Sequence, residues 1–138
     1  MRRYLLDTGP LAAYLNGRPA AVELISPWIA RREAATSILV YAEVVEYFKG
    51  LPRFEERRSE LHRLLRTVYP YFLTYPITER YADIRRSLRQ PYGPGLIGDI
   101  DTLIAATALE RSLTIVTTDH DYERVPDLAT MIVRVRNS

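Results

Sequence analysis

The 138-residue chain contains no cysteine, which excludes both a disulfide framework and a thiolate metal site. It also has no apolar run of the roughly 18 residues that a transmembrane helix needs, so we expect no membrane partner. Histidine is scarce, because His62 and His120 are the only two, and their spacing fits no metal-ligand pattern. We see no Ser/His/Asp arrangement either. Catalysis through a cysteine or a serine triad is therefore not indicated.

The chain also has almost no excess of charge of one sign, since its net charge is only +2. Lys49 is the only lysine among 19 basic residues, and the rest are arginine. Guanidinium groups bind phosphate bidentately and stack on bases, so this composition suits nucleic acid binding. It suits a GC-rich or thermophilic genome equally well. The composition alone does not decide between the two.

The length and the hydrophobic fraction of 47% are those of one globular domain with a full core. We therefore expect a single domain over residues 1–138. The first apolar run meets Asp7 too early for the apolar region of a signal peptide, so a cytoplasmic location is the default expectation.

Short apolar runs alternate with segments of helical spacing along the chain. Ser37 and Thr78 are expected to cap helices, and Pro27 must lie near a helix start or a kink. The expected strands are residues 3–6, 34–36, 71–75, 113–117 and 131–135. The expected helices are residues 11–15, 20–32, 38–49, 54–68, 78–89 and 99–111, with a loop at 90–98 and a loop or short turn at 118–127.

This alternation of apolar strands and helices predicts an α/β fold, a three-layer α/β/α sandwich with a mostly parallel central sheet. In such sheets, binding sites form at the carboxyl ends of the strands. Four acidic residues stand at strand ends or on helices that follow loops, and the geometry permits one shared site: Asp7, Glu43, Asp101 and Asp119.

Each of these acids also has a structural explanation. Asp7 could simply cap the helix that follows it, and Asp119 could belong to an ordinary turn. Asp99 and Asp101 begin a helix, where acidic residues favour the helix dipole. However, that helix is so apolar that its first turn should face the sheet. Glu43 interrupts an apolar helix, where a solvated charge is unexpected.

A cluster of carboxylates calls for a cation, because like charges repel and are costly to desolvate. Oxygen ligands with open water positions suit Mg²⁺ or Mn²⁺, the metals of phosphate chemistry. Thr117 or Thr118 could hold a metal-bound water, and His120 could contribute from the periphery. The hypothesis from these residues is a metal site that serves phosphate chemistry.

The sequence around these acids resembles the PIN-domain ribonucleases, and more narrowly the VapC-type toxins of toxin–antitoxin pairs. The resemblance covers essentially the full length. It is carried, in order, by residues 7–11 (Asp-Thr-Gly-Pro-Leu), Glu43 within residues 37–45, residues 101–106 (Asp-Thr-Leu-Ile-Ala-Ala), residues 117–119 (Thr-Thr-Asp) and the tail at residues 122–128.

The resemblance implies a parallel-sheet α/β/α sandwich, divalent-metal-dependent cleavage of RNA, a homodimer and a cognate VapB-type antitoxin. Asp7, Glu43 and Asp101 match the core acidic positions of the family as catalytic and metal-binding residues. Asp119 matches a fourth position that is often acidic. Asp99 is carried over only as a residue behind the metal ligands, and Glu46 and Asp121 are not carried over.

Three other classes of protein compete with this hypothesis. A phosphoacceptor receiver needs an acidic pair after the first strand and a late lysine, but the chain has only Asp7 there and no lysine beyond Lys49. A HAD-like phosphatase needs Asp-x-Asp, whereas Thr8 and Gly9 follow Asp7. A PIN-like binding protein without nuclease activity is the remaining alternative, and calorimetry with Mn²⁺ would distinguish it.

Overall fold

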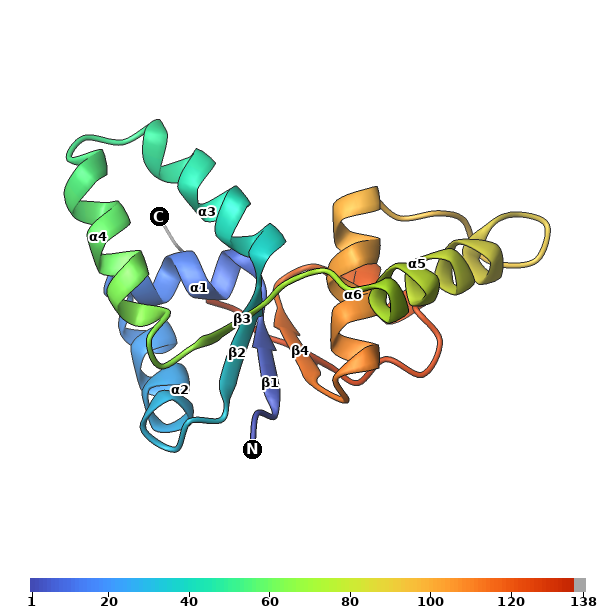
Figure 1. Ribbon diagram of the computed structural model, residues 1–138, viewed down its shortest axis with the longest axis horizontal. Helices are drawn as coiled ribbons and strands as arrows, with labels where there is room; N and C mark the ends of the chain where they lie inside the picture. The colour runs from blue at the N-terminus through green and yellow to red at the C-terminus, as the bar shows by residue number, and fades with distance from the viewer. Residues whose placement is uncertain (136–138) are drawn as a thin grey trace.

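The computed structural model describes residues 1–135, which form a five-stranded sheet flanked by helices (Figure 1). The elements in chain order are β1 (Tyr4–Leu6), α1 (Thr8–Leu15), α2 (Pro19–Ala30), β2 (Ala34–Ser37), α3 (Ile38–Lys49), α4 (Phe54–Leu64), β3 (Tyr69–Tyr71), α5 (Tyr75–Leu88), α6 (Asp99–Glu110), β4 (Thr114–Thr117), the 3₁₀-helix η1 (His120–Arg124) and β5 (Thr130–Ile132).

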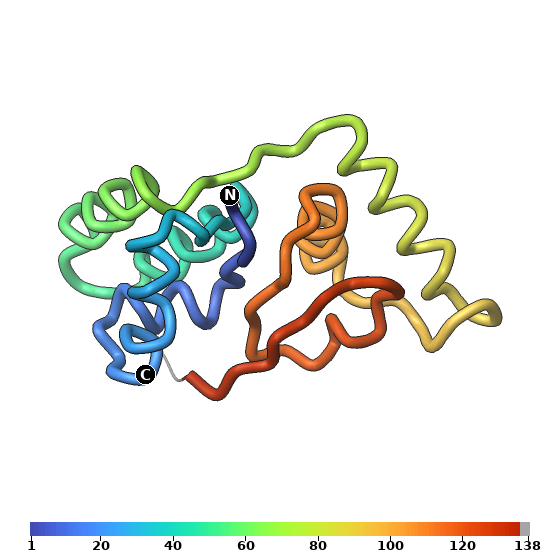
Figure 2. The backbone as a smooth tube through the Cα atoms, turned by 90° about the horizontal axis from the view of Figure 1, so that it is seen from below, coloured from blue at the N-terminus to red at the C-terminus, as the bar shows by residue number. Residues whose placement is uncertain are grey.

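All neighbouring strands are parallel, and their order is β3-β2-β1-β4-β5. Helices α1 to α4 lie on one side of the sheet and α5 and α6 on the other, as both views show (Figures 1 and 2). This is the α/β/α sandwich that the alternation of elements predicts. Because the strands are parallel, their carboxyl ends all lie at one edge of the sheet.

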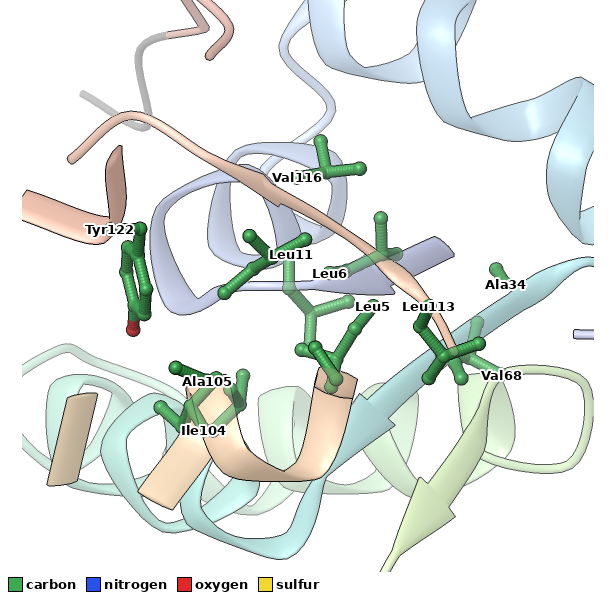
Figure 3. Close-up of a cluster of buried hydrophobic side chains, with 14 of the residues drawn as sticks. Leu5, Leu6, Leu11, Ala34, Val68, Ile104, Ala105, Leu113, Val116 and Tyr122 are labelled. Carbon is green, nitrogen blue, oxygen red and sulfur yellow. The ribbon is translucent and has the colours of Figure 1, made fainter. Parts of the chain in front are cut away.

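The core is built around β1, the central strand. Leu5 and Leu6 are both fully buried, although successive strand residues point to opposite faces, because helices cover both sides of the sheet. Helix α6 packs closely with small side chains, since Ala105, Ala106 and Ala108 have no exposed surface. Figure 3 shows Leu5, Leu11 and Ala105 within this apolar cluster.

The start of α3 follows its sequence prediction closely. Ser37 ends β2 and caps α3, and its hydroxyl accepts a hydrogen bond of 3.0 Å from the backbone N–H of Leu39. This cap leaves no room for a loop, so the helix begins directly at the carboxyl edge of the sheet. Glu43, in the second turn, is thereby kept near that edge.

The predicted strand at residues 71–75 and the predicted cap at Thr78 are wrong. The strand β3 is Tyr69–Tyr71, and α5 already begins at Tyr75. Its cap is Thr74, whose hydroxyl accepts from the N–H of Ile77. The aromatic run continues beyond the strand, which hides its end. Pro76 fits the first helical turn because the N–H groups there need no intrahelical partner.

Other boundaries differ by smaller amounts. Helix α4 ends at Leu64 rather than at residue 68, and β5 ends at Ile132 rather than at residue 135. Pro27 does not start a helix but lies inside α2, near its end. The expected loop at residues 118–127 contains the turn of η1. Within residues 1–135, no helix is long and apolar enough to cross a membrane.

Candidate active site

The four acids named from the sequence gather at the carboxyl edge of the sheet. Asp7 directly follows β1, and Asp119 follows β4 after one intervening residue. Glu43 lies on α3 and Asp101 in the first turn of α6. Their charges interact: Asp7 is repelled by Asp101 and Glu43, and Asp101 is repelled by Asp119 and Glu43. We call these four residues the acidic cluster.

Asp7 lies at the centre of the acidic cluster, with only 8% of its surface exposed. Burial raises the pKa of its carboxyl to about 6, and repulsion by Asp101 and Glu43 adds to that rise. A 2.7 Å hydrogen bond from the Thr117 hydroxyl to Oδ2 opposes the rise, as does the backbone N–H of Thr8. Asp7 is therefore a carboxylate whose charge the fold accommodates only at a cost.

Glu43 accepts a hydrogen bond from the first residue of α1. The hydroxyl of Thr8 donates a hydrogen bond of 2.6 Å to Oε1 of Glu43. Thr8 is the first residue of α1, directly after Asp7, so the turn that ends β1 positions two acids at once. The apolar surroundings of Glu43 in the sequence are explained by Val40 and Val44, which are fully buried beneath it.

Asp101 receives the hydroxyl of Tyr122, which donates to Oδ1 at 3.1 Å. Partial burial raises the pKa of Asp101, and repulsion by Asp119, Glu43 and Asp121 acts in the same direction. The Tyr122 hydrogen bond lowers it. Burial and the adjacent carboxylates also raise the pKa of Tyr122 far above its usual value, so the phenol remains a hydrogen-bond donor.

Asp119 is joined to Asp7 through Thr117. The Thr117 hydroxyl accepts from the backbone N–H of Asp119 at 3.0 Å while it donates to Asp7. Oδ1 of Asp119 accepts from the N–H of Asp121 at 2.8 Å and so caps η1. The turn interpretation from the sequence is thus also correct, because Asp119 caps a turn and belongs to the acidic cluster.

The start of α1 and the end of β4 approach each other closely beside this cluster. A Cβ atom on Gly9 would lie 3.1 Å from Oγ1 of Thr118, which is tighter than an ordinary contact. Glycine is therefore the residue that lets the two segments meet. Thr118 itself is exposed, while Thr117 is the buried threonine that bonds to the acids.

The remaining polar candidates lie outside the acidic cluster. Asp99 is exposed and accepts from Arg85 at 2.6 Å and from the hydroxyl of Tyr81 at 3.0 Å. His120 pairs with Glu123 at 2.7 Å. Two further side chains also point elsewhere: Glu46 is exposed, and His62 bonds to the hydroxyl of Tyr41.

Two hydroxyl groups at this site were not singled out from the sequence, those of Thr8 and Tyr122. Both stand in segments that carry the family resemblance, at residues 7–11 and 122–128. The spacing of a hydroxyl relative to a carboxylate on another element is not visible in the sequence. The only available signal for Tyr122 was a tyrosine in a short segment after the last acid.

The donor set fits a hard divalent cation, because its ligands are carboxylate oxygens with hydroxyl and backbone support. Within residues 1–135, no salt bridge reaches any of the four acids. In the same part of the chain, no three His, Asp or Glu side chains lie close enough to ligate one ion directly. Mg²⁺ commonly binds through one or two carboxylates and keeps several waters, so the site suits an ion that retains part of its hydration shell.

The protein thus belongs to the class of parallel α/β/α sandwiches that gather carboxylates at the carboxyl edge of the sheet. Residues 4–128 match the sequence model of the PIN domain family. The chain belongs to the PIN domain family. No curated protein sequence matches it.

Solved structures agree with this assignment. The chain is similar to a chain of VapBC2 from Rickettsia felis bound to a promoter DNA fragment, with 24% identity and a TM-score of 0.82, over 95% of this chain and 98% of that one. It is similar to FitAcB from Neisseria gonorrhoeae at 26% identity, with a TM-score of 0.70, over 93% and 96%. A toxin–antitoxin complex from Klebsiella pneumoniae matches at 22% identity, with a TM-score of 0.71, over 94% and 99%.

Proposed function

We propose that this protein is a metal-dependent endoribonuclease and the toxin of a toxin–antitoxin pair. The observation that carries the proposal is Asp7, a buried carboxylate beside two other carboxylates with a pKa raised to about 6. An arrangement of this kind is unfavourable by itself and becomes favourable with a bound cation. Functional sites are where such strongly perturbed groups collect.

Asp7, Glu43 and Asp101 would hold Mg²⁺ or Mn²⁺ in part through the waters that the ion retains, and Asp119 would orient a water at the same edge. The metal would supply an activated hydroxide and stabilise the charge of the leaving oxygen. The hydroxyl groups of Thr117, Thr8 and Tyr122 keep the three carboxylates in fixed orientations. No side-chain nucleophile is needed, which agrees with the absence of cysteine.

The proposed partners follow from the family and from the neighbouring structures. VapBC2 and the Klebsiella protein are described as toxin–antitoxin or promoter-bound assemblies, so we propose a VapB-type antitoxin as partner. The RNA substrate would bind through arginine side chains. We further propose that residues 1–138 form a single PIN-like domain that acts in the cytoplasm.

A homodimer is part of the same proposal. The strand β3 lies at the sheet edge, and the segment that runs from it to α5 exposes several large apolar side chains. Contiguous exposed apolar residues are typical of interaction surfaces. These residues are Tyr69, Phe72, Leu73 and Tyr75.

The test is cleavage of total RNA by the purified protein with Mg²⁺, with Mn²⁺ and with a chelator, followed by mapping of the cleaved ends. Asp7→Asn should reduce cleavage by more than about 100-fold, since even residues behind a metal ligand affect activity by roughly 10- to 100-fold. The matched control is Asp99→Asn, which alters an acid outside the acidic cluster and should leave cleavage unchanged.

Cleavage by Asp7→Asn at the wild-type rate would contradict the assignment of the site. If calorimetry detects no Mn²⁺ binding and RNA remains intact, the alternative of a PIN-like binding protein without nuclease activity is favoured. Circular dichroism of each variant confirms that the fold is retained.

A further inference from the structure

We propose that Tyr122 is a positioning residue of the acidic cluster, which holds Oδ1 of Asp101 and leaves Oδ2 for the cation. The inference rests on the proposed function, because it assigns a role toward the metal that this function requires. Tyr122 is the largest fully buried side chain of the described residues. Its hydroxyl donates to Oδ1 of Asp101 at 3.1 Å.

The geometry distinguishes the two oxygens of Asp101. A phenol has one hydrogen to donate, and here it goes to Oδ1. Among residues 1–135, Oδ2 receives no hydrogen bond, and no buried side-chain oxygen or nitrogen lacks a partner. Oδ2 therefore keeps some accessible surface, and it is the oxygen of Asp101 that no hydrogen bond among residues 1–135 occupies.

A hydroxyl group likewise donates to each of the two neighbouring acids. Oδ2 of Asp7 accepts from Thr117, and Oε1 of Glu43 accepts from Thr8. Three carboxylates thus each receive one hydroxyl, from three different elements. Hydrogen bonds to the ligating carboxylates orient them and contribute to metal affinity. Tyr122 provides for Asp101 what the two threonines provide for Asp7 and Glu43.

Tyr122 is well suited to this role because its ring cannot move freely. Tyr122 and Leu11 belong to the same buried cluster, and in Figure 3 the phenol oxygen points toward the side of the view on which Ala105 of α6 lies. Asp119 caps η1, and Tyr122 on η1 donates to Asp101, so this short helix contacts two of the four acids. A side chain with two rotatable bonds and no exposed surface maintains this link.

The chain offers a matched control, a second tyrosine that bonds to an aspartate in the first turn of α6. Tyr81 donates its hydroxyl to Oδ1 of Asp99 at 3.0 Å, so it makes the same kind of bond to an aspartate of α6. Asp99, however, is exposed and already paired with Arg85. Removal of the Tyr81 hydroxyl tests what a tyrosine–aspartate bond contributes without a role toward the cation.

The experiment compares Tyr122→Phe and Tyr81→Phe in the full chain. Mn²⁺ affinity is measured by calorimetry, and thermal melting is recorded for each variant without metal. Tyr122→Phe should bind Mn²⁺ about 10-fold more weakly, the lower end of the usual effect of such residues, and Tyr81→Phe should match the wild type. A variant with p-aminophenylalanine at position 122 restores a donor and should recover most of the affinity.

Each outcome decides between the two proposals. Wild-type Mn²⁺ affinity in Tyr122→Phe would overturn the role of Tyr122 and leave the proposed function intact. Absence of Mn²⁺ binding and RNA cleavage in the wild type would overturn both. If Tyr122→Phe does not fold, the p-aminophenylalanine variant decides: retained affinity supports the role of the donor, and lost affinity in a folded protein overturns it.

Discussion

Two aspartates lie in the same first turn of α6 but have charged neighbours of opposite sign. Asp99 and Asp101 each accept a tyrosine hydroxyl, and both lie in the first helical turn, where the helix dipole favours negative charge. Asp99 is exposed and carries the guanidinium of Arg85 at 2.6 Å. Asp101 is partly buried, with other carboxylates as its charged neighbours.

The comparison shows which property separates these two carboxylates. A place in the first turn of α6 does not, because both residues share it. The balance of charge does: Arg85 compensates the negative charge of Asp99, whereas no salt bridge within residues 1–135 reaches Asp101, and the proposed function assigns that compensation to a metal ion. We call Asp99 with Arg85 the Asp99 side, and Asp101 with the rest of the acidic cluster the Asp101 side. The predictions below test the contrast between these two groups of residues.

The largest expected effect on stability is at Asp7, on the Asp101 side. Its pKa is about 6 in the folded protein against an ordinary 3.8, so folding favours the protonated form. In metal-free protein, this contribution to stability is complete below about pH 3.8 and is lost as the pH rises through about 6. Asp7→Asn should therefore be more stable than the wild type near neutral pH by about 3 kcal/mol, at roughly 1.4 kcal/mol for each pKa unit.

Urea unfolding in a chelator, at several pH values between about 4 and 7, measures this effect. The gain from Asp7→Asn should shrink toward zero at the acidic end. Asp99→Asn, the control on the Asp99 side, should show no gain at any pH, because it removes a carboxylate that already has an ion-pair partner. Equal stability of Asp7→Asn and the wild type at neutral pH would refute the burial of an uncompensated charge at Asp7.

A smaller effect is expected from Thr117, which connects Asp7 with the backbone of Asp119. Thr117→Val keeps the shape but removes the hydroxyl that donates to Asp7 and accepts from the Asp119 N–H. We expect a loss of about 2 kcal/mol, since two polar groups lose their partner, and a further rise in the pKa of Asp7.

Thr107→Val is the matched control, because Thr107 is also buried but donates only to the backbone carbonyl of Leu103 in its own helix. Its effect should be clearly smaller in the same unfolding experiment. If the two variants lose equal stability, the Thr117 hydroxyl contributes nothing particular to the acidic cluster.

The sequence was sufficient to predict the fold and the gathering of the four acids at one edge of the sheet, for separate reasons. The strands are buried on both faces, so their apolar runs stand out, and parallel strands bring their ends to one edge. The acids interrupt or follow these runs and are therefore visible. Glu43 was the clearest of them, because the buried Val40 and Val44 make its charge conspicuous.

What the sequence did not provide was the pairing of hydroxyl groups with acids. Tyr122 and Asp101 are 21 residues apart, and Thr117 and Asp7 are 110 apart, so only the folded chain brings them together. The end of β3 was missed because its aromatic residues continue to Tyr75. The balance of charge at Asp99 likewise depends on Arg85, which only the packing of α5 on α6 places beside it.

The smallest effect is expected on the Asp99 side, from Arg85→Ala. The Arg85 side chain is one-quarter exposed and that of Asp99 more than two-thirds exposed, so water screens the ion pair. Its loss should cost less than about 1 kcal/mol in urea unfolding, and RNA cleavage should remain at the wild-type level. The decisive comparison is Mn²⁺ affinity. Asp99 lies outside the acidic cluster, so freeing it from Arg85 exposes a charge without adding a ligand to the site, and calorimetry should give the wild-type affinity. A marked change in affinity or cleavage would mean that the Asp99 side takes part in the site once its charge is no longer compensated.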